Sequence, residues 1–478
     1  MARQVLPADL QRGAILGAMS QTKHRLARFG SQLLVAASLG CGTDEALPAS
    51  AELLTGHEID AWSAMPAPAT VRVDLAQGEQ RTKLAEGRAP ASIFDIDPAS
   101  IPRGTIAALG ARAFDASGAV VLNGATVPFF INNIAGVRVP IFLARTGGWS
   151  RPPGTLERAH QHAAVAVAGH QYLIAAGGDT LASGNAAFPD FYDVANWTTL
   201  KGQAPLPRAP KSLVAVSLGL LVVDGEGATW LDLTTNKTNA AAPPDGLSFA
   251  EVTGGDTVAL PSRVQFLIGG TRADGTPTNK VVRIDTDGHF RTVLLAAPRL
   301  GAAAAVVGGK LFVVGGSVGS EGAGAEVLNA GEDAFEPVAL AADGSSGLAV
   351  EALEGSTAIL VGGSDAAGAA MPVRTFDTSC ATACATTTVG EMPIALRRTR
   401  AFAQKAGEVL VVGESADSET HAFSVTVTGG VATVAERALR ERRIGATALL
   451  LPNGQVGVVG GLKTEGTDPV TTIEAFFP

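Results

Sequence analysis

A short apolar run that ends on a glycine pair recurs through the last two thirds of the chain. Its clearest copy is KLFVVGGS at residues 310–317, and related runs such as YLIAAGGD and QVGVVGGL stand at 172–179 and 455–462. The first positions of the pairs follow one another at a near-constant interval, at Gly177, Asp224, Gly269, Gly315, Gly362, Gly413 and Gly460. Spacing this regular predicts seven copies of one structural unit.

The residues inside each unit distinguish between the two architectures that have this period, a helical solenoid and a β-propeller. Each unit holds an Ala/Val run, a turn, a second apolar run, the glycine pair, a polar loop and a third apolar run. Runs this short, rich in valine and separated by glycine, are typical of strands and too brief for solenoid helices. The sequence therefore predicts propeller blades.

This pattern resembles the kelch-repeat family. The resemblance rests on the glycine pair at the end of each second strand, on an arginine at a recurring distance before it, and on an aromatic residue near the fourth strand. The arginines are Arg208, Arg299 and Arg397 at one common spacing, with Arg443 and Arg158 slightly further from their pairs, and the aromatic residues are Tyr192, Trp197, Phe290 and Phe335. The chain departs from the pattern where the second pair is Asp-Gly and the sixth Gly-Glu, and where units three and five lack the arginine.

The resemblance implies an all-β fold in which residues 146–478 form a seven-bladed kelch-like β-propeller. The last unit ends at the C-terminus with only three strands of its own, while residues 148–152 carry a tryptophan at the place that Trp197 holds one unit later. We therefore expect residues 148–152 to supply the missing outer strand of the last blade, because closing the ring removes unpaired strand edges. The resemblance leaves function open, since kelch propellers serve as binding platforms and, less often, as enzymes.

Residues 53–145 lie outside the sevenfold pattern. Segments such as ATVRVDL and GAVVLNG alternate with the strand period and are separated by Pro, Gly and Asp-Ala-Ser-Gly turns. A region of this length with such strands predicts a small β-sandwich, immunoglobulin-like in type although it has no Cys-Trp-Cys framework. It would act as a spacer or as a second binding module.

Residues 1–40 have the layout of a secretory signal. They carry five Lys or Arg and a single acidic residue, followed by the short apolar run LLVAASLG. The run is too short to span a bilayer. Translation could begin at Met1 or at Met19, since the segment from Met19 is a compact signal by itself.

The sequence SLGC, which ends at Cys41, resembles a bacterial lipobox, in which the cysteine is lipidated and becomes the mature N-terminus. Ser38 stands where a bulky aliphatic residue is usual, and cleavage after Ala37 with simple secretion is the alternative. The resemblance implies a signal peptide over 1–40 and a lipidated tether over 41–52, and the glycine after Cys41 implies the outer membrane. A secreted or periplasmic location remains open.

The net charge of the chain limits the classes of molecule that it can bind. The chain has a net charge of −9, and because residues 1–40 contribute +4, the charge without them is −13. We expect no nucleic-acid partner, because no basic cluster is dense enough to follow phosphates, and membrane contact only through the lipid. We expect a monomer without cofactor.

Topology places one set of basic residues together. In a four-stranded meander, the links between blades and the links between second and third strands open on the same face. That mouth would carry the candidate ligand-binding residues Arg158, His160, Arg208, Arg299, Arg397, Arg398, Arg400, Arg442 and Arg443. They would bind an anionic ligand such as an acidic sugar or a carboxylate, or they would bond backbone carbonyls and hold the blades in register.

Cys380 and Cys384 lie in the longest interval, between the third and fourth strands of unit five, and are close enough to pair. We expect a local disulfide there, with a metal site as the alternative, although no further pair of Cys or His ligands stands nearby. His160 and His162 would share one strand face but lack a third ligand. We therefore expect no metal.

The catalytic motifs Gly-x-Ser-x-Gly, the phosphate loop and His-Glu-x-x-His are absent from the sequence. Copper radical oxidases share the kelch fold, but their redox tyrosine linked to cysteine has no counterpart here. The sequence therefore favours a non-catalytic envelope lipoprotein that binds protein or glycan partners at the propeller mouth. A sugar-active enzyme of the isomerase or oxidase class is the alternative, because such isomerases use dispersed polar residues.

Overall fold

The computed structural model describes residues 48–478 apart from 79, 103, 132–133, 135, 179–186, 202, 217–218, 273, 319–320, 323, 341, 343–344, 381–383 and 465. The predicted signal peptide, Cys41 and residues 41–47 of the predicted tether lie outside the described residues. The described part is an all-β fold whose helical segments are the 3-10 turns Pro98–Ser100 and Phe249–Val252. None of its helical segments has the length and hydrophobicity that a membrane span requires.

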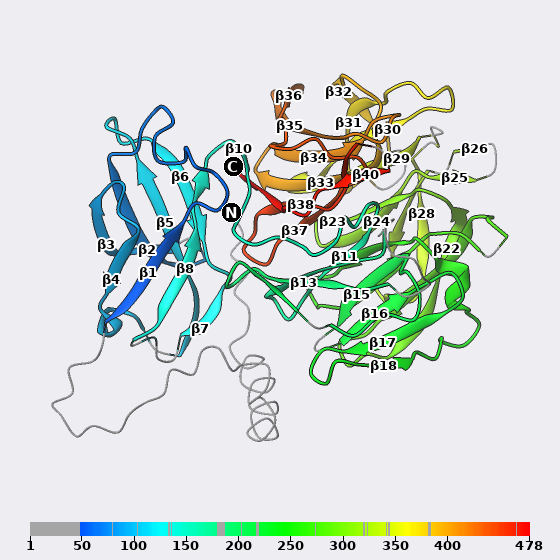
Figure 1. Cartoon of the computed structure of the whole chain (residues 1–478). Coiled ribbons are helices and arrows are strands. Elements are labelled where there is room, and N and C mark those ends of the chain that lie inside the picture. Colours follow the sequence, from blue (N-terminus) through cyan, green and yellow to red (C-terminus); the bar gives the residue numbers. More distant parts are fainter. Residues whose placement is uncertain are drawn as a thin grey trace. The chain divides into compact units, whose positions relative to one another are not determined.

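Residues 49–145 form two sheets around one core (Figure 1, blue to cyan). The smaller sheet has the order β4 (Ile93–Ile96), β1 (Ala49–Leu54), β8 (Arg138–Phe142), with β1 and β8 parallel. The larger has the order β3 (Gln80–Arg88), β2 (Thr70–Gln77), β5 (Thr105–Phe114), β6 (Val120–Ala125), β9 (Ala144–Arg145), and β7 (Phe129–Ile131) also pairs with β5.

The alternating pattern predicted for these strands explains how they pack. Ala49, Ala51 and Leu53 point from β1 into the core that Val71 and Val73 of β2 enter from the other sheet. The two-sheet arrangement agrees with the sandwich expected from the sequence. Its first strand begins at Ala49 rather than at residue 53, because the small apolar side chains of Ala49 and Ala51 are fully buried.

The remaining described chain forms seven four-stranded antiparallel sheets. Sheet one is β11 (Ala164–Ala168), β12 (Tyr172–Ala176), β13 (Asp190–Asp193) and β14 (Thr198–Leu200), and sheet two is β15 (Ser212–Val216), β16 (Gly219–Val223), β17 (Ala228–Asp232) and β18 (Lys237–Ala240). Sheet three is β19 (Asp256–Ala259), β20 (Gln265–Ile268), β21 (Thr278–Ile284) and β22 (Phe290–Arg299), and sheet four is β23 (Ala303–Val307), β24 (Lys310–Val314), β27 (Ala325–Leu328) and β28 (Phe335–Val338).

Sheet five is β29 (Ser346–Glu354), β30 (Thr357–Ser364), β31 (Pro372–Asp377) and β32 (Thr387–Glu391), and sheet six is β33 (Arg397–Lys405), β34 (Glu408–Glu414), β35 (Thr420–Thr428) and β36 (Val431–Glu436). Sheet seven is β37 (Thr447–Leu450), β38 (Val456–Val459), β41 (Glu474–Phe477) and β10 (Gly148–Ser150). Two short hairpins lie in the loops of sheets four and seven: β25 (Ser317–Val318) with β26 (Glu321–Gly322), and β39 (Leu462–Thr464) with β40 (Thr467–Pro469).

The predicted pairing of residues 148–152 with the last sheet is confirmed. Strand β10 pairs antiparallel with β41, so that Trp149 lies opposite Phe476. The Trp149 indole is buried, contacts the Phe476 ring edge-on at 5.3 Å between centroids, and donates a hydrogen bond from Nε1 to the Arg437 carbonyl at 2.9 Å. Sheet seven is therefore built from two distant parts of the chain.

Both faces of each sheet are buried, which explains the continuous apolar runs. In β24, Leu311 and Val313 enter a cluster shared with sheet three, whereas Phe312 and Val314 enter one shared with sheet five. Further clusters join sheets one and two, two and three, five and six, and six and seven. A last cluster joins sheets seven and one, so the seven sheets pack in a closed cyclic order.

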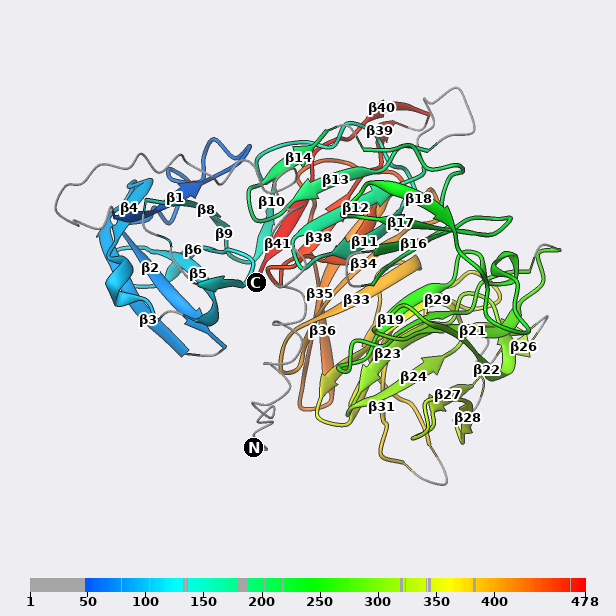
Figure 2. The same cartoon turned by 90° about the horizontal axis from the view of Figure 1, so that it is seen from below.

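The first strands of the seven sheets follow the same cyclic order. Each contacts the first strand of the next sheet, and β37 contacts β11. Figure 2 shows β19, β23, β29 and β33 gathered in the middle of the seven sheets. The starts of these strands build the site described next.

Candidate functional site: a pocket shared by seven sheets

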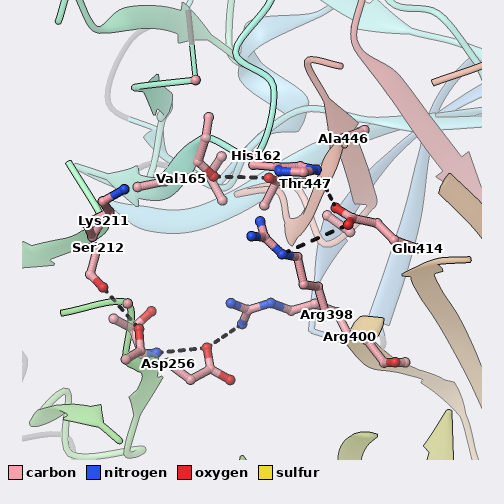
Figure 3. Close-up of a pocket in the computed structure, with 18 of the residues that line it drawn as sticks. His162, Val165, Lys211, Ser212, Asp256, Arg398, Arg400, Glu414, Ala446 and Thr447 are labelled. Carbon is pink, nitrogen blue, oxygen red and sulfur yellow. Dashed lines mark hydrogen bonds and ion pairs between the residues drawn. The ribbon is translucent and has the colours of Figure 1, made fainter. Parts of the chain in front are cut away.

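All seven sheets contribute to one cavity of about 580 Å³ at the starts of their first strands. Its lining is mostly small, with alanine and glycine from every side, and none of the described lining residues is Phe, Tyr or Trp. The charged or titratable side chains among them are His162, Lys211, Asp256, Arg398, Arg400 and Glu414 (Figure 3). The predicted mouth is thus a real cavity, and two of the nine predicted ligand-binding residues, Arg398 and Arg400, line it.

The glycine pairs lie where backbone segments pack closely. Gly315 and Gly316 both have a positive φ, at 67° and 86°. A Cβ at Gly315 would lie 3.0 Å from Leu348 of the next sheet, and one at Gly316 would lie 3.1 Å from the backbone before β23 of the same sheet. The first glycine therefore allows contact between sheets and the second allows contact within a sheet.

Arg398 reaches the cavity because β33 is irregular. The ladder between β33 and β34 shifts register between Arg397 and Arg400, and Arg398 has a φ of 48°. Irregularities of this kind redirect a side chain, and a non-glycine residue at positive φ is strained. The Arg398 side chain is 61% exposed and its Nε lies 3.9 Å from Glu414 Oε2.

Glu414 and His162 form a close pair of titratable groups in the wall. Glu414 Oε1 lies 3.4 Å from His162 Nε2, and the Glu414 side chain is only 8% exposed. Burial raises the pKa of Glu414, and the charges of Arg398 and Arg397 only partly oppose this. Burial, together with the charge of Arg398, lowers the pKa of His162. Both shifts oppose ionisation of the two groups.

Arg400 and Asp256 form an ion pair across the cavity (Figure 3). Arg400 Nη1 lies 2.6 Å from Asp256 Oδ1. Arg400 belongs to β33 of sheet six, and Asp256 is the first residue of β19 in sheet three. In the cyclic order of the sheets, sheets four and five lie between these two strands on one side, and sheets seven, one and two lie between them on the other.

Two of the predicted arginines are buried and hold the sheets together. Arg299 donates to the Gly315 and Gly324 carbonyls at 2.7 Å and pairs with Glu326 at 2.8 Å, and both side chains are 2% exposed. Arg443 donates to the Gly460 carbonyl at 2.9 Å and pairs with Glu474 at 3.0 Å, with both side chains fully buried. These contacts favour the structural alternative for both arginines.

Sheet one uses a histidine where sheets four and seven use an arginine. The His160 ring is buried, with Nδ1 3.0 Å from the Gly177 carbonyl and Nε2 3.0 Å from Asp190. Arg158 Nη1 lies 2.6 Å from the same carboxylate, and its guanidinium stacks over Phe188 at 4.9 Å. Burial would raise the pKa of Asp190, but the hydrogen bond and charge of His160, a backbone N–H and the charge of Arg158 outweigh it, and the pKa is lowered.

The other predicted arginines also lie outside the cavity. Arg208 pairs with Asp224 at 3.0 Å and with Glu226 at 3.2 Å. Arg442 pairs with Glu419 at 2.9 Å and donates to the Lys463 carbonyl at 3.0 Å. Arg397 is exposed.

Cys380 and Cys384 form the predicted disulfide, in the link between β31 and β32. The Cys384 N–H donates to the Ala339 carbonyl at 3.0 Å, which ties this link to sheet four. Both thiols are used in this bond, so they are not metal ligands here. Within the described ranges no three His, Cys, Asp or Glu are grouped as a metal ion would require.

The sequence predictions did not assign Glu414, Asp256, Lys211 or His162 to the mouth. Glu414 carried a signal, because it replaces the second glycine of the sixth pair. Asp256 carried none, because the first strands of the other sheets begin with alanine, serine, threonine or arginine. Lys211 and His162 carried none, since their placement depends on how seven separate links converge.

One segment of the chain matches a known repeat family. Residues 298–339 match the kelch motif family, a segment that contains Arg299 and most of sheet four. No curated protein sequence matches the chain. The solved structure described as "Structure of YjhT" is similar over 57% of this chain and 97% of its own, with 13% sequence identity and a TM-score of 0.40.

Proposed function

We propose that this protein is a non-catalytic lipoprotein of the outer membrane that binds protein or glycan partners. In this proposal residues 146–478 are a seven-bladed kelch-like propeller, and residues 53–145 are an immunoglobulin-like spacer. Seven four-stranded sheets with a cyclic packing order, the kelch motif at 298–339 and the two sheets around one N-terminal core support these assignments.

One observation carries the binding function. A cavity of about 580 Å³ lies where all seven sheets meet, and its size is in the range of small-molecule sites. Arg398 and Arg400 project into it with 61% and 41% of their side chains exposed. Two accessible guanidinium groups in a concave site suit the binding of carboxylate, sulfate or phosphate groups.

A screen against a glycan array and purified envelope proteins tests this function. We expect at least one partner whose binding falls tenfold or more in Arg398→Glu. Arg442→Glu is the matched control, because Arg442 is also exposed but lies outside the cavity. A partner that both variants bind equally well, or the absence of any partner, would contradict the proposal.

The proposed anchor rests on the lipobox-like SLGC and the glycine after Cys41. Mass spectrometry of the mature N-terminus tests it, and we expect a diacylglyceryl-modified and N-acylated Cys41. An unmodified N-terminus at Ser38 would instead indicate simple secretion.

The pair His162 and Glu414 favours a sugar-active enzyme as the second candidate. Catalytic acids and bases are often found where burial shifts two neighbouring pKa values, as it does for this pair at 3.4 Å. Turnover of free sugars that is lost in Glu414→Gln would support the enzyme. Absence of turnover over a broad sugar panel would leave the binding function.

A further inference from the structure

The Arg400–Asp256 ion pair joins sheets that are not neighbours, unlike the buried ion pairs of the seven sheets. Arg299–Glu326 and Arg443–Glu474 join neighbouring elements and are buried. Arg400 and Asp256 instead reach across the cavity from sheets that are not neighbours, and their side chains are 41% and 26% exposed. An ion pair this exposed contributes little to stability, because solvent screens it. It can therefore be broken at little cost.

The contact with Asp256 indicates that the Arg400 guanidinium can bind a carboxylate group. At 2.6 Å the Asp256 carboxylate makes a short, charge-assisted contact with the guanidinium. The Asp256 carboxylate comes from the far wall of a cavity that is otherwise open to solvent. It thus occupies the position that the carboxylate of a ligand would take.

Glu414 adds a second requirement on the ligand. Its carboxyl group is nearly buried, yet its contacts with His162 and Arg398, at 3.4 and 3.9 Å, are longer than charge-assisted hydrogen bonds. Burying a carboxyl group without strong partners is costly. A hydroxyl group of a ligand would supply the missing donor.

The lining does not favour recognition by stacking. Its described residues include no Phe, Tyr or Trp, and the apolar ones are mainly alanine, valine and leucine. Selectivity must therefore come from the charged groups, from polar side chains such as Gln161, Ser212 and Thr447, and from exposed backbone. A ligand with one negative charge and several hydroxyl groups fits these groups better than a neutral or aromatic one.

We propose that the cavity binds a small hydroxylated carboxylate, that Arg400 holds the carboxylate, and that Asp256 is a built-in competitor which the ligand displaces. In this arrangement Arg398 supplies a second positive charge and Glu414 accepts a hydrogen bond from a ligand hydroxyl (Figure 3). The inference rests on the proposed binding function and specifies its ligand class.

Calorimetric titration with D-glucuronate and D-glucose tests the inference, since the two probes share a ring and differ in the carboxylate. Asp256→Asn removes the competitor, so we expect glucuronate to bind at least tenfold more tightly than to the unmodified protein. Arg400→Gln should weaken glucuronate binding at least tenfold. Binding of glucose should be weak and should not change in either variant.

Glu419→Gln controls for a general effect of removing one negative charge. Glu419 pairs with Arg442 outside the cavity, so this variant should bind glucuronate as the unmodified protein does. If Arg400→Gln melts at a markedly lower temperature, Arg400→Lys replaces it, because lysine keeps the charge but loses the fork geometry. Arg400→Lys should then weaken binding by a smaller factor.

Three results would overturn the inference: no glucuronate binding to either the unmodified protein or Asp256→Asn, unchanged affinity in Asp256→Asn, or an equal gain in Glu419→Gln. If the array screen nevertheless finds a partner that Arg398→Glu no longer binds, the proposed binding function stands and only the role of Asp256 and the ligand class are withdrawn.

Discussion

Sheets four and six are two copies of one repeat that use the same positions differently. The arginine that precedes the glycine pair of sheet four at the repeat spacing, Arg299, ends β22 of sheet three. It is 2% exposed and bonds two carbonyls and Glu326 of sheet four. In sheet six the arginine with the same spacing, Arg397, is exposed, and the second glycine is replaced by Glu414. Sheet four keeps the repeat and matches the kelch motif, whereas sheet six departs from it and supplies three charged side chains to the cavity.

The difference shows where function separates from architecture in a repeat protein. Arg299 agrees with the repeat and lies between sheets, where it bonds carbonyls and Glu326. Arg398, Arg400 and Glu414 depart from the repeat and face the shared cavity.

Replacing the repeat arginine should have different consequences in the two sheets. Arg299→Met leaves Glu326 buried and without its cation, and breaking a buried pair costs about 3–5 kcal/mol. Arg397→Met removes an exposed side chain and should cost about 0.5 kcal/mol or less. Denaturant unfolding of both variants measures the difference, and equal losses would refute the assignment of Arg299 to the fold.

Replacing the first glycine of the pair should also separate the sheets. Gly315 has a φ of 67°, and a Cβ there would lie 3.0 Å from Leu348 and 3.3 Å from Ser345. Gly315→Ala should therefore cost about 1–3 kcal/mol in strain and displacement. Gly413 does not have a positive φ, although a Cβ there would lie 3.1 Å from Leu396. Thermal melting should show a smaller loss for Gly413→Ala, and a larger one would contradict the comparison.

Replacing Glu414 should stabilise the protein in a pH-dependent way. Burial raises the pKa of Glu414, so the folded state binds this proton more tightly than the unfolded state does. Stability is then lost as pH rises from the ordinary glutamate pKa through the raised one. Glu414→Gln should raise the melting temperature by about 1–3 °C at pH 7, and the gain should disappear as the pH falls to about 4.

The control for this pH effect is Glu419→Gln, since Glu419 is accessible and lies outside the cavity. Its melting temperature should follow that of the unmodified protein across the same pH range. A stability gain for Glu414→Gln that does not change with pH would indicate a packing effect and would contradict the raised pKa.

Several features of the fold follow from local chemistry and were predicted. Most of the seven repeat positions mark the ends of second strands with a glycine, because only glycine readily tolerates a positive φ in so crowded a place. The pairing of Trp149 with the last sheet follows from counting strands, and the disulfide from the proximity of Cys380 and Cys384. The start of β1 at Ala49 was missed, because a short run of alanine and serine is equally typical of a linker.

The candidate site was predicted only in part. Arg398 and Arg400 line the cavity, whereas the burial of Arg299 and Arg443 agrees with the alternative in which arginines bond backbone carbonyls and hold the sheets in register. His160 and Arg443 are buried beside carboxylates from later parts of the chain, Asp190 and Glu474. No spacing in the sequence predicts these carboxylates as partners. Both belong to third strands, and the number of residues between a first and a third strand depends on loop length.

Valine runs and glycine pairs at a near-constant interval are enough to predict a sevenfold repeat of short strands, since few other structures have this pattern. Which charged groups meet depends instead on how the sheets pack. Arg400 and Asp256 are far apart in sequence and belong to sheets that are not neighbours, and they pair because the first strands of all seven sheets converge on one cavity. The pairing of these two side chains therefore depends on the packing of all seven sheets, which the sequence of a single repeat does not contain.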